Sequence, residues 1–157
     1  MIVEVEAAQW VASATALRGE GCPWFGLLTA VDDPAASTLD VVLVVGGAEG
    51  VANRGLRCTI DRADPCLDSV AGLWPGAGLA EREVHEMFGV RFIGNDDLRP
   101  LLLPAGATAA PLRRDAGLGR RASTEWPGAV EPGDEARARR RPVRPVAADP
   151  TDWVVEL

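Results

Sequence analysis

Residues 80–103 read AEREVHEMFGVRFIGNDDLRPLLL, and the way this stretch must fold decides the architecture around it. Its first part predicts a helix over residues 79–88, because apolar residues recur there at helical spacing. The residues on the shared apolar face are Ala80, Val84, Met87 and Phe88. Gly89 follows at the position where many helices end in a left-handed residue. We therefore expect this face to pack on a sheet of the same domain.

The other side of the predicted helix is charged. Its polar residues are Glu81, Arg82, Glu83, His85 and Glu86. We expect this band to point away from the domain, with Arg82 and Glu86 paired one turn apart. A solvated helix face is the alternative interpretation of such a band.

A tight turn is predicted directly after the helix, where Gly94, Asn95, Asp96 and Asp97 stand together. Because Pro100 favours an extended backbone in the residue before it, Arg99 is expected to reach outward. An arginine held in this way is suited to a bidentate contact with a neighbouring carboxylate.

The remaining segments predict one α+β domain over residues 1–103. Apolar alternation and β-branched residues predict strands over residues 2–6, 25–31, 39–45 and 56–60. The third of these is almost wholly apolar, as a strand buried on both faces would be. Helical spacing predicts a helix over 7–17, and Asp64-Pro65 predicts the start of another. The order indicates a two-layer sandwich, a mostly antiparallel sheet with helices on one face.

Residues 104–157 are predicted to form an extended tail that cannot fold on itself, because proline interrupts every potential helix there and apolar periodicity is absent. Two large aromatic residues of this tail, Trp126 and Trp153, are costly to leave in water. We expect them to anchor in pockets of partner proteins. A merely disordered extension is the alternative.

The composition of the 157-residue chain, 47% apolar with a net charge of -7, allows one domain with its own core. The charge is uneven, since the chain is acidic up to Leu112 and basic from Arg113 to Arg144. The sequence shows neither an apolar run long enough to cross a bilayer nor a signal peptide. We expect a protein that reaches the membrane only through partners and has no nucleic-acid partner.

Chemistry-bearing residues are sparse. The three cysteines, Cys22, Cys58 and Cys66, form no CxxC pair, and an iron-sulfur cluster normally takes four cysteine ligands. His85 is the only histidine and has no second histidine or cysteine near it in sequence. We therefore expect no catalytic residue, no metal site and no cofactor in this chain. A free-standing enzyme that uses Glu81, Glu83 and His85 as acid-base groups is the alternative from a different class.

The stretch from Glu81 to Arg99 resembles the signature E-R-E-x-[YW]-D-[ML]-F-G-[IV]-x-F-x-G-H-P-[DN]-L-R of the C subunits of the proton-pumping NADH-quinone oxidoreductases, respiratory complex I. The residues that fall on the pattern are Glu81, Arg82, Glu83, Met87, Phe88, Gly89, Val90, Phe92, Gly94, Asp97, Leu98 and Arg99. Four residues depart from it: His85, Glu86, Asn95 and Asp96. Residues 69–83 and Pro111–Asp115 resemble the segments before and after the signature.

The resemblance implies a structural subunit of the hydrophilic arm, on the cytoplasmic side of the cell membrane and peripheral to it. It also implies that the tail over residues 104–157 wraps partner subunits. Its partners would be the large hydrogenase-like subunit at the quinone site and neighbouring iron-sulfur subunits. Flavin and iron-sulfur clusters would then lie in partner subunits. The alternative is the equivalent subunit of a group 4 membrane-bound [NiFe]-hydrogenase or formate hydrogenlyase, with a nickel-iron centre in a partner.

The resemblance also places the charged band of the helix at a contact between subunits. The expected interface residues are Glu81, Arg82, Glu83, His85, Glu86, Asp97, Arg99, Arg113, Arg114, Trp126 and Trp153.

Overall fold

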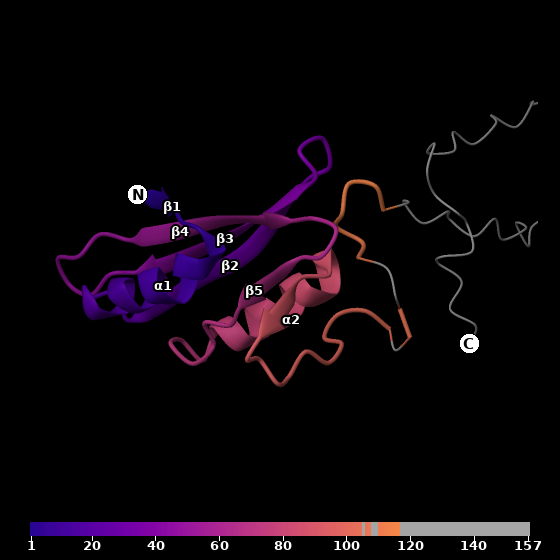
Figure 1. Cartoon of the computed structure of the whole chain (residues 1–157). Coiled ribbons are helices and arrows are strands. Elements are labelled where there is room, and N and C mark those ends of the chain that lie inside the picture. The colour runs from indigo at the N-terminus through magenta and orange to yellow at the C-terminus, as the bar shows by residue number, and fades with distance from the viewer. Residues whose placement is uncertain (105, 108–109, 117–157) are drawn as a thin grey trace, which may run out of the picture.

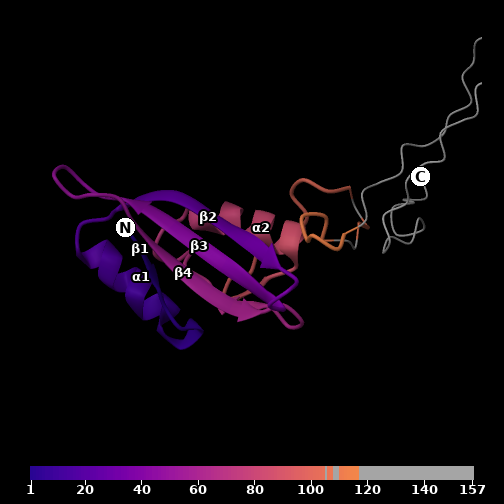
Figure 2. The same cartoon turned by 90° about the horizontal axis from the view of Figure 1, so that it is seen from above.

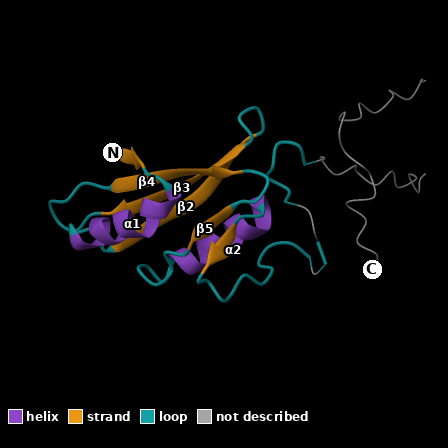
Figure 3. Cartoon of the chain, in the orientation of Figure 1, coloured by secondary structure: helices purple, strands orange, loops and turns teal. Residues whose placement is uncertain are grey.

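The structure, a computed structural model, describes residues 1–104, 106–107 and 110–116 (Figures 1 and 3). Its elements in chain order are β1 (Ile2–Glu4), the short 3-10 helix η1 (Ala7–Gln9), α1 (Trp10–Gly19), β2 (Trp24–Asp33), β3 (Thr38–Gly46), β4 (Arg54–Asp61), β5 (Cys66–Asp68), α2 (Ala77–Phe88) and β6 (Arg91–Ile93). Among the described residues, no helix has the length and apolar character needed to span a membrane.

Four strands form the main sheet, in the order β1-β4-β3-β2. β3 pairs antiparallel with both β2 and β4, whereas β1 pairs parallel with β4. Both helices lie against the same face of this sheet, as the side view and the view from above show (Figures 1 and 2). The predicted α+β two-layer sandwich with a mostly antiparallel sheet is confirmed.

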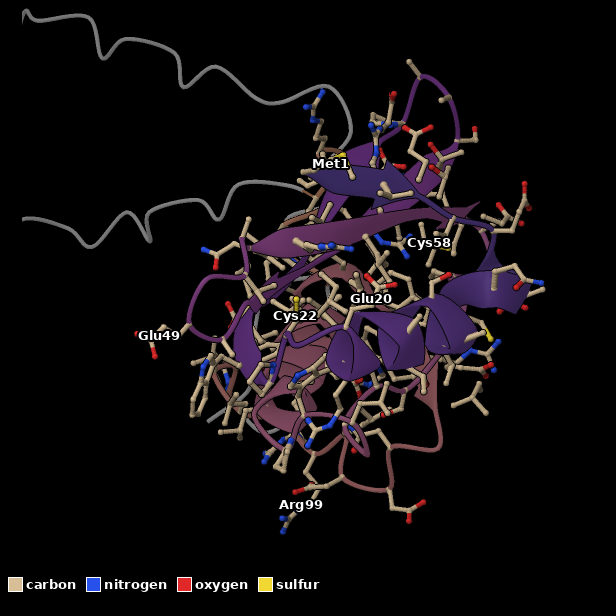
Figure 4. The ribbon with its side chains drawn as sticks, turned by 90° about the vertical axis from the view of Figure 1, so that its left-hand side faces the viewer. Met1, Glu20, Cys22, Glu49, Cys58 and Arg99 are labelled. Carbon is tan, nitrogen blue, oxygen red and sulfur yellow. The ribbon has the colours of Figure 1, made fainter. Side chains whose placement is uncertain are left out.

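The core lies between the helices and the inner face of the sheet. Its fully buried members from β3 are Leu39, Val41, Leu43 and Val45, and the helices add Trp10, Ala14, Leu17, Val84, Met87 and Phe88. Cys22 and Cys58 are also buried in this interior (Figure 4). Burial raises the pKa of the Cys58 thiol to about 11, so the unreactive protonated form prevails at neutral pH.

The prediction of a helix that starts at Asp64-Pro65 is wrong. Residues 66–68 form β5 instead, which pairs parallel with β6. Asp64 caps no helix, and its carboxylate accepts a hydrogen bond from Arg91 Nη2 at 2.6 Å. The pairing with β6, a segment far along the chain, outweighs the local helix-start signal.

The strand over residues 39–45 was predicted to be buried on both faces, and only its inner face fits that prediction. Val42 and Val44 on the outer face are half-buried, because the helices cover the opposite face (Figure 2). A β-bulge between Phe25 and Leu27 also shifts the alternation of β2, so Leu27 lies outward and is 49% exposed.

Candidate functional site

The helix of the signature segment is α2, which ends at a left-handed residue as predicted. Gly89 has φ +77°, and its N–H donates to the carbonyl of His85 at 2.8 Å. A Cβ at this position would lie 3.3 Å from Nη2 of Arg113. Gly89 therefore both ends the helix and leaves room for a side chain from the segment after residue 110.

Glu81 does not point away from the domain, contrary to the prediction. It is fully buried, and its carboxylate accepts three hydrogen bonds. Ser69 Oγ and Asn95 Nδ2 donate to Oε2 at 2.7 and 2.9 Å, and the Val70 N–H donates to Oε1 at 2.8 Å. A buried carboxylate needs such donors, and they leave Glu81 no exposed surface for a partner.

Arg82 turns onto its own chain rather than outward. Its Nε donates to the carbonyl of Arg99 at 3.0 Å and its Nη2 to the carbonyl of Pro100 at 3.0 Å. A longer contact of 3.4 Å joins Nη1 to the carboxylate of Asp97. The predicted pair with Glu86 is not formed among the described side chains.

Glu86 holds the same segment from a second point. Its carboxylate accepts the N–H groups of Leu101, Leu102 and Leu103 at 3.1, 2.8 and 2.9 Å. Burial disfavours its charge, yet these three amides and the positive charge of Arg82 outweigh burial and lower the pKa of Glu86. Arg82 and Glu86 together fix the backbone of residues 99–103 against α2.

Arg99 is exposed and projects from the domain, as predicted (Figure 4). Its bidentate contact is made within the chain, with Nε and Nη2 lying 2.7 and 3.0 Å from the two carboxylate oxygens of Asp97. These hydrogen bonds lower the pKa of Asp97 to about 2. The side chain of Arg99 is nevertheless 79% exposed, so one side of the pair faces solvent.

The fixed segment borders a hollow of about 280 Å³ at the C-terminal end of α2. Its lining includes His85, Leu98, Pro100, Leu103, Pro104 and Ala110. His85 Nδ1 lies 2.8 Å from the carbonyl of Val90, so Nδ1 carries the proton and donates to it. Beside the hollow the side chains of Leu101, Leu102 and Leu112 are 42, 61 and 55% exposed.

The other predicted interface residues differ in their exposure and in their contacts. Glu83 is exposed on α2, whereas Arg113 is half-buried and its Nε donates to the carbonyl of Phe88 at 2.7 Å. Arg114 is exposed, and its backbone N–H donates to Asp32 at 2.8 Å. Trp126 and Trp153 lie outside the described residues.

Sequence reasoning missed Asp32, because Asp32-Asp33-Pro34 has the composition of a turn. Asp32 is buried at the end of β2, and Arg62 Nε donates to it at 2.6 Å. Asp32 continues the series of inward-facing residues that begins with Leu28 and Ala30. This series can be predicted only if the bulge in β2, which shifts the alternation, is known.

Comparison with protein families gives one clear match. Proteins described as the 30 Kd subunit of respiratory-chain NADH dehydrogenase match residues 3–122 of this chain. The C subunit of the NADH-quinone oxidoreductase of Moorella thermoacetica is 35% identical over 112 residues, covering 71% of this chain and 76% of that protein. NADH-quinone oxidoreductase subunit 5 of Thermus thermophilus is 38% identical over 85 residues, covering 54% of this chain and 41% of that protein.

Two solved structures share the fold. One belongs to the membrane-bound sulfane sulfur reductase, described as an archaeal respiratory membrane complex, with a TM-score of 0.65 and 25% identity over 71% of this chain and 68% of that chain. The other is the trypsin-resistant fragment of Nqo5, with a TM-score of 0.56 and 24% identity over 60% of this chain and 80% of that one.

Proposed function

The chain belongs to the family of 30 Kd subunits of respiratory-chain NADH dehydrogenases, and we propose that it is a structural subunit of a membrane-bound NADH-quinone oxidoreductase. In this proposal it carries no catalytic residue and no cofactor. It braces the large subunit at the quinone site, contacts neighbouring iron-sulfur subunits and lies peripherally on the cytoplasmic side of the membrane. Flavin and iron-sulfur clusters reside in the partners.

The observation that carries the proposal is the fixed segment over residues 99–103. Arg82 holds its first carbonyls and Glu86 holds its last three amides, so its backbone is ordered before any partner arrives. Leu101 and Leu102 nevertheless extend into solvent from this backbone. Adjacent exposed leucines on a preorganised segment are typical of a protein contact, because little conformational freedom remains to be lost on binding.

Charged side chains surround this apolar contact. Arg99 is exposed within the fixed segment and donates to the Asp97 carboxylate, and Glu83 is exposed on α2, next in sequence to Arg82. An apolar centre with a charged rim is the usual anatomy of a subunit interface. In this arrangement Arg99 and Glu83 contribute to the choice of partner, and the leucines contribute most of the affinity.

A related complex is the second candidate. The shared fold with the membrane-bound sulfane sulfur reductase supports a subunit of another respiratory membrane complex, such as a group 4 [NiFe]-hydrogenase. The two candidates use the same surface and differ in their partners. Subunits that bind NADH and flavin indicate the first, and a nickel-binding large subunit indicates the second.

The experiment replaces Leu101 or Leu102 by Asp in a tagged chain and recovers the complex from solubilised native membranes. Recovery of partner subunits is expected to fall at least tenfold, because a charge enters the dry centre of the contact. The isolated variants should unfold close to the wild-type temperature, since Leu101 and Leu102 are 42 and 61% exposed and lie outside the core.

The matched control is Leu27→Asp, another leucine of 49% exposure, which lies outward on β2, on the face of the sheet opposite the helices. It should assemble as the wild type does. If both leucine variants recover the same partners in the same amount as the wild type, the fixed segment is not the interface and the proposal fails.

A further inference from the structure

The segment that follows the hollow is tied to the domain at four consecutive residues, 112–115. The Leu112 N–H donates to the carbonyl of Met87 at 3.1 Å, and Arg113 Nε donates to that of Phe88. Arg114 bonds to Asp32 in β2, and Asp115 bonds to Arg62, which directly follows β4. These four residues are called the strap below.

Asp32 is the group that receives the strap at the sheet. Its side chain is 1% exposed, and its Oδ2 accepts both the Arg114 N–H at 2.8 Å and Arg62 Nη2 at 3.2 Å. Arg62 Nε donates to Oδ1 at 2.6 Å, while Arg62 Nη2 also contacts the carboxylate of Asp115. The side-chain hydrogen bonds from Arg62 lower the pKa of Asp32, so it is ionised at neutral pH.

The arrangement makes the strap and the buried charge depend on each other. Removing the strap would take one donor from Asp32 and one carboxylate from Arg62. A buried carboxylate that loses a donor is strongly disfavoured. The strap has no regular secondary structure, so these contacts are what hold it in place.

We propose that Asp32 and Arg62 form a latch that holds the strap and so fixes the position of residues 112–116 relative to the domain. The latch joins the ends of β2 and β4 to residues more than fifty positions later in the sequence. Residues 110–116 thereby lie beside both the end of the sheet and the end of α2 (Figure 1). In the assembly, which rests on the proposed function, the latch keeps the exposed Leu112 in place beside the hollow, so that it adds to the partner contact made at residues 99–103.

The latch is tested on the free full-length chain by hydrogen exchange and mass spectrometry. Asp32→Asn keeps the shape of the side chain but cannot accept from Arg62 and Arg114 with both oxygens. The amides of residues 112–116 should exchange at least tenfold faster, while those of α1 and β3 stay within twofold of wild type. Unchanged exchange in the strap overturns the proposal.

The control is Asp40→Asn, which alters another buried carboxylate of the same sheet. Asp40 accepts hydrogen bonds from Arg57 and Thr59 and has no bond to the strap. It should leave exchange at residues 112–116 as in wild type. Equal acceleration in the two variants would mean that Asp32 only stabilises the domain as a whole, and would overturn the latch.

Asp115→Asn keeps the proposal testable if Asp32→Asn does not fold, because the Asp115 side chain is 55% exposed. Exchange at residues 114–116 should rise about threefold in this variant, and no rise counts against the latch.

Assembly is measured separately, as recovery of partners with Asp32→Asn. A loosened strap with full recovery overturns the role in assembly and leaves the latch standing, whereas failure of the Leu101 and Leu102 experiment removes the proposed function alone.

Discussion

Glu81 shows how a single charged residue can act as part of a core. Its two carboxylate oxygens join the start of the loop after β5, the turn at Asn95 and the middle of α2. Asn95 Nδ2 also contacts the carbonyl of Gly78 at 3.4 Å, whereas the Ser69 hydroxyl and the Val70 amide donate only to Glu81 among the described residues. Glu81 therefore stabilises the arrangement of three segments, although it makes no ion pair within the described residues.

We predict that Glu81→Ala lowers the free energy of unfolding by about 2 to 5 kcal/mol, because each buried donor left without an acceptor costs about 1 to 3 kcal/mol. Urea unfolding followed by circular dichroism measures the change. Glu83→Ala, two positions away and exposed, should alter the same quantity by less than about 0.5 kcal/mol. Equal effects of the two substitutions would contradict the role given to Glu81.

The sequence contained a signal for the burial of Glu81. The residue shares a helical stripe with Ala77, Val84 and Phe88, all of which are buried. A helix predicted to begin at residue 79 omits Ala77, so Glu81 then looks like one member of a charged band. Asn95 gave no such signal, because its contact with Glu81 joins two segments whose approach depends on the whole fold.

The local sequence determines where helices and strands end more closely than it determines which strands pair. The helix over 79–88 and its glycine cap were predicted and are confirmed, as were the first helix and the four strands of the sheet. The three-residue strand β5 was not predicted, because it is defined by its pairing with β6, which the local sequence does not show. A strong helix-start signal at Asp64-Pro65 was then the only local information available.

The cap of α2 gives a prediction for a whole element. Gly89→Ala should lower the free energy of unfolding by roughly 1 to 2 kcal/mol, because a left-handed φ is unfavourable for a residue with a Cβ. The new methyl group would also crowd Arg113 Nη2. Thermal and urea unfolding of the purified chain measure the effect.

Gly19→Ala is the control for that substitution. Gly19 is the last residue of α1, and a Cβ there meets nothing within 4 Å. Alanine at this position should leave stability unchanged or raise it by up to about 1 kcal/mol. A loss of stability at Gly19 equal to that at Gly89 would show that the backbone conformation is not the cause.

At the scale of the molecule, the arginines are paired mostly within the described domain. Arg62 pairs with Asp32 and Asp115, and Arg82 and Arg99 both contact Asp97. The sequence indicated that guanidinium groups would make bidentate contacts with carboxylates, and it assigned those contacts to partner subunits. Charge alone cannot distinguish a carboxylate of the same chain from one of a neighbour, since that depends on which residues folding brings together.

The carboxylates in these contacts predict how the domain responds to acid. Hydrogen bonds from Arg62 lower the pKa of Asp32, those from Arg99 lower that of Asp97 to about 2, and backbone amides lower that of Glu86 despite its burial. Burial also opposes the charge of Asp40, but Thr59 and Arg57 outweigh it and lower its pKa. All four are ionised in the folded state at neutral pH.

A carboxylate whose folded pKa is lowered stabilises the fold above its unfolded pKa, and this stability is lost as the pH falls through the folded pKa. The melting temperature should therefore stay nearly constant from pH 7 to about 5 and fall between about pH 4 and 2. Asp40→Asn, which removes one titrating group, should start from a lower melting temperature and decline less steeply over the same interval. Calorimetry at half-unit steps of pH measures both curves, and a melting temperature that holds constant or rises below about pH 4 would show that these hydrogen-bonded carboxylates do not support the fold.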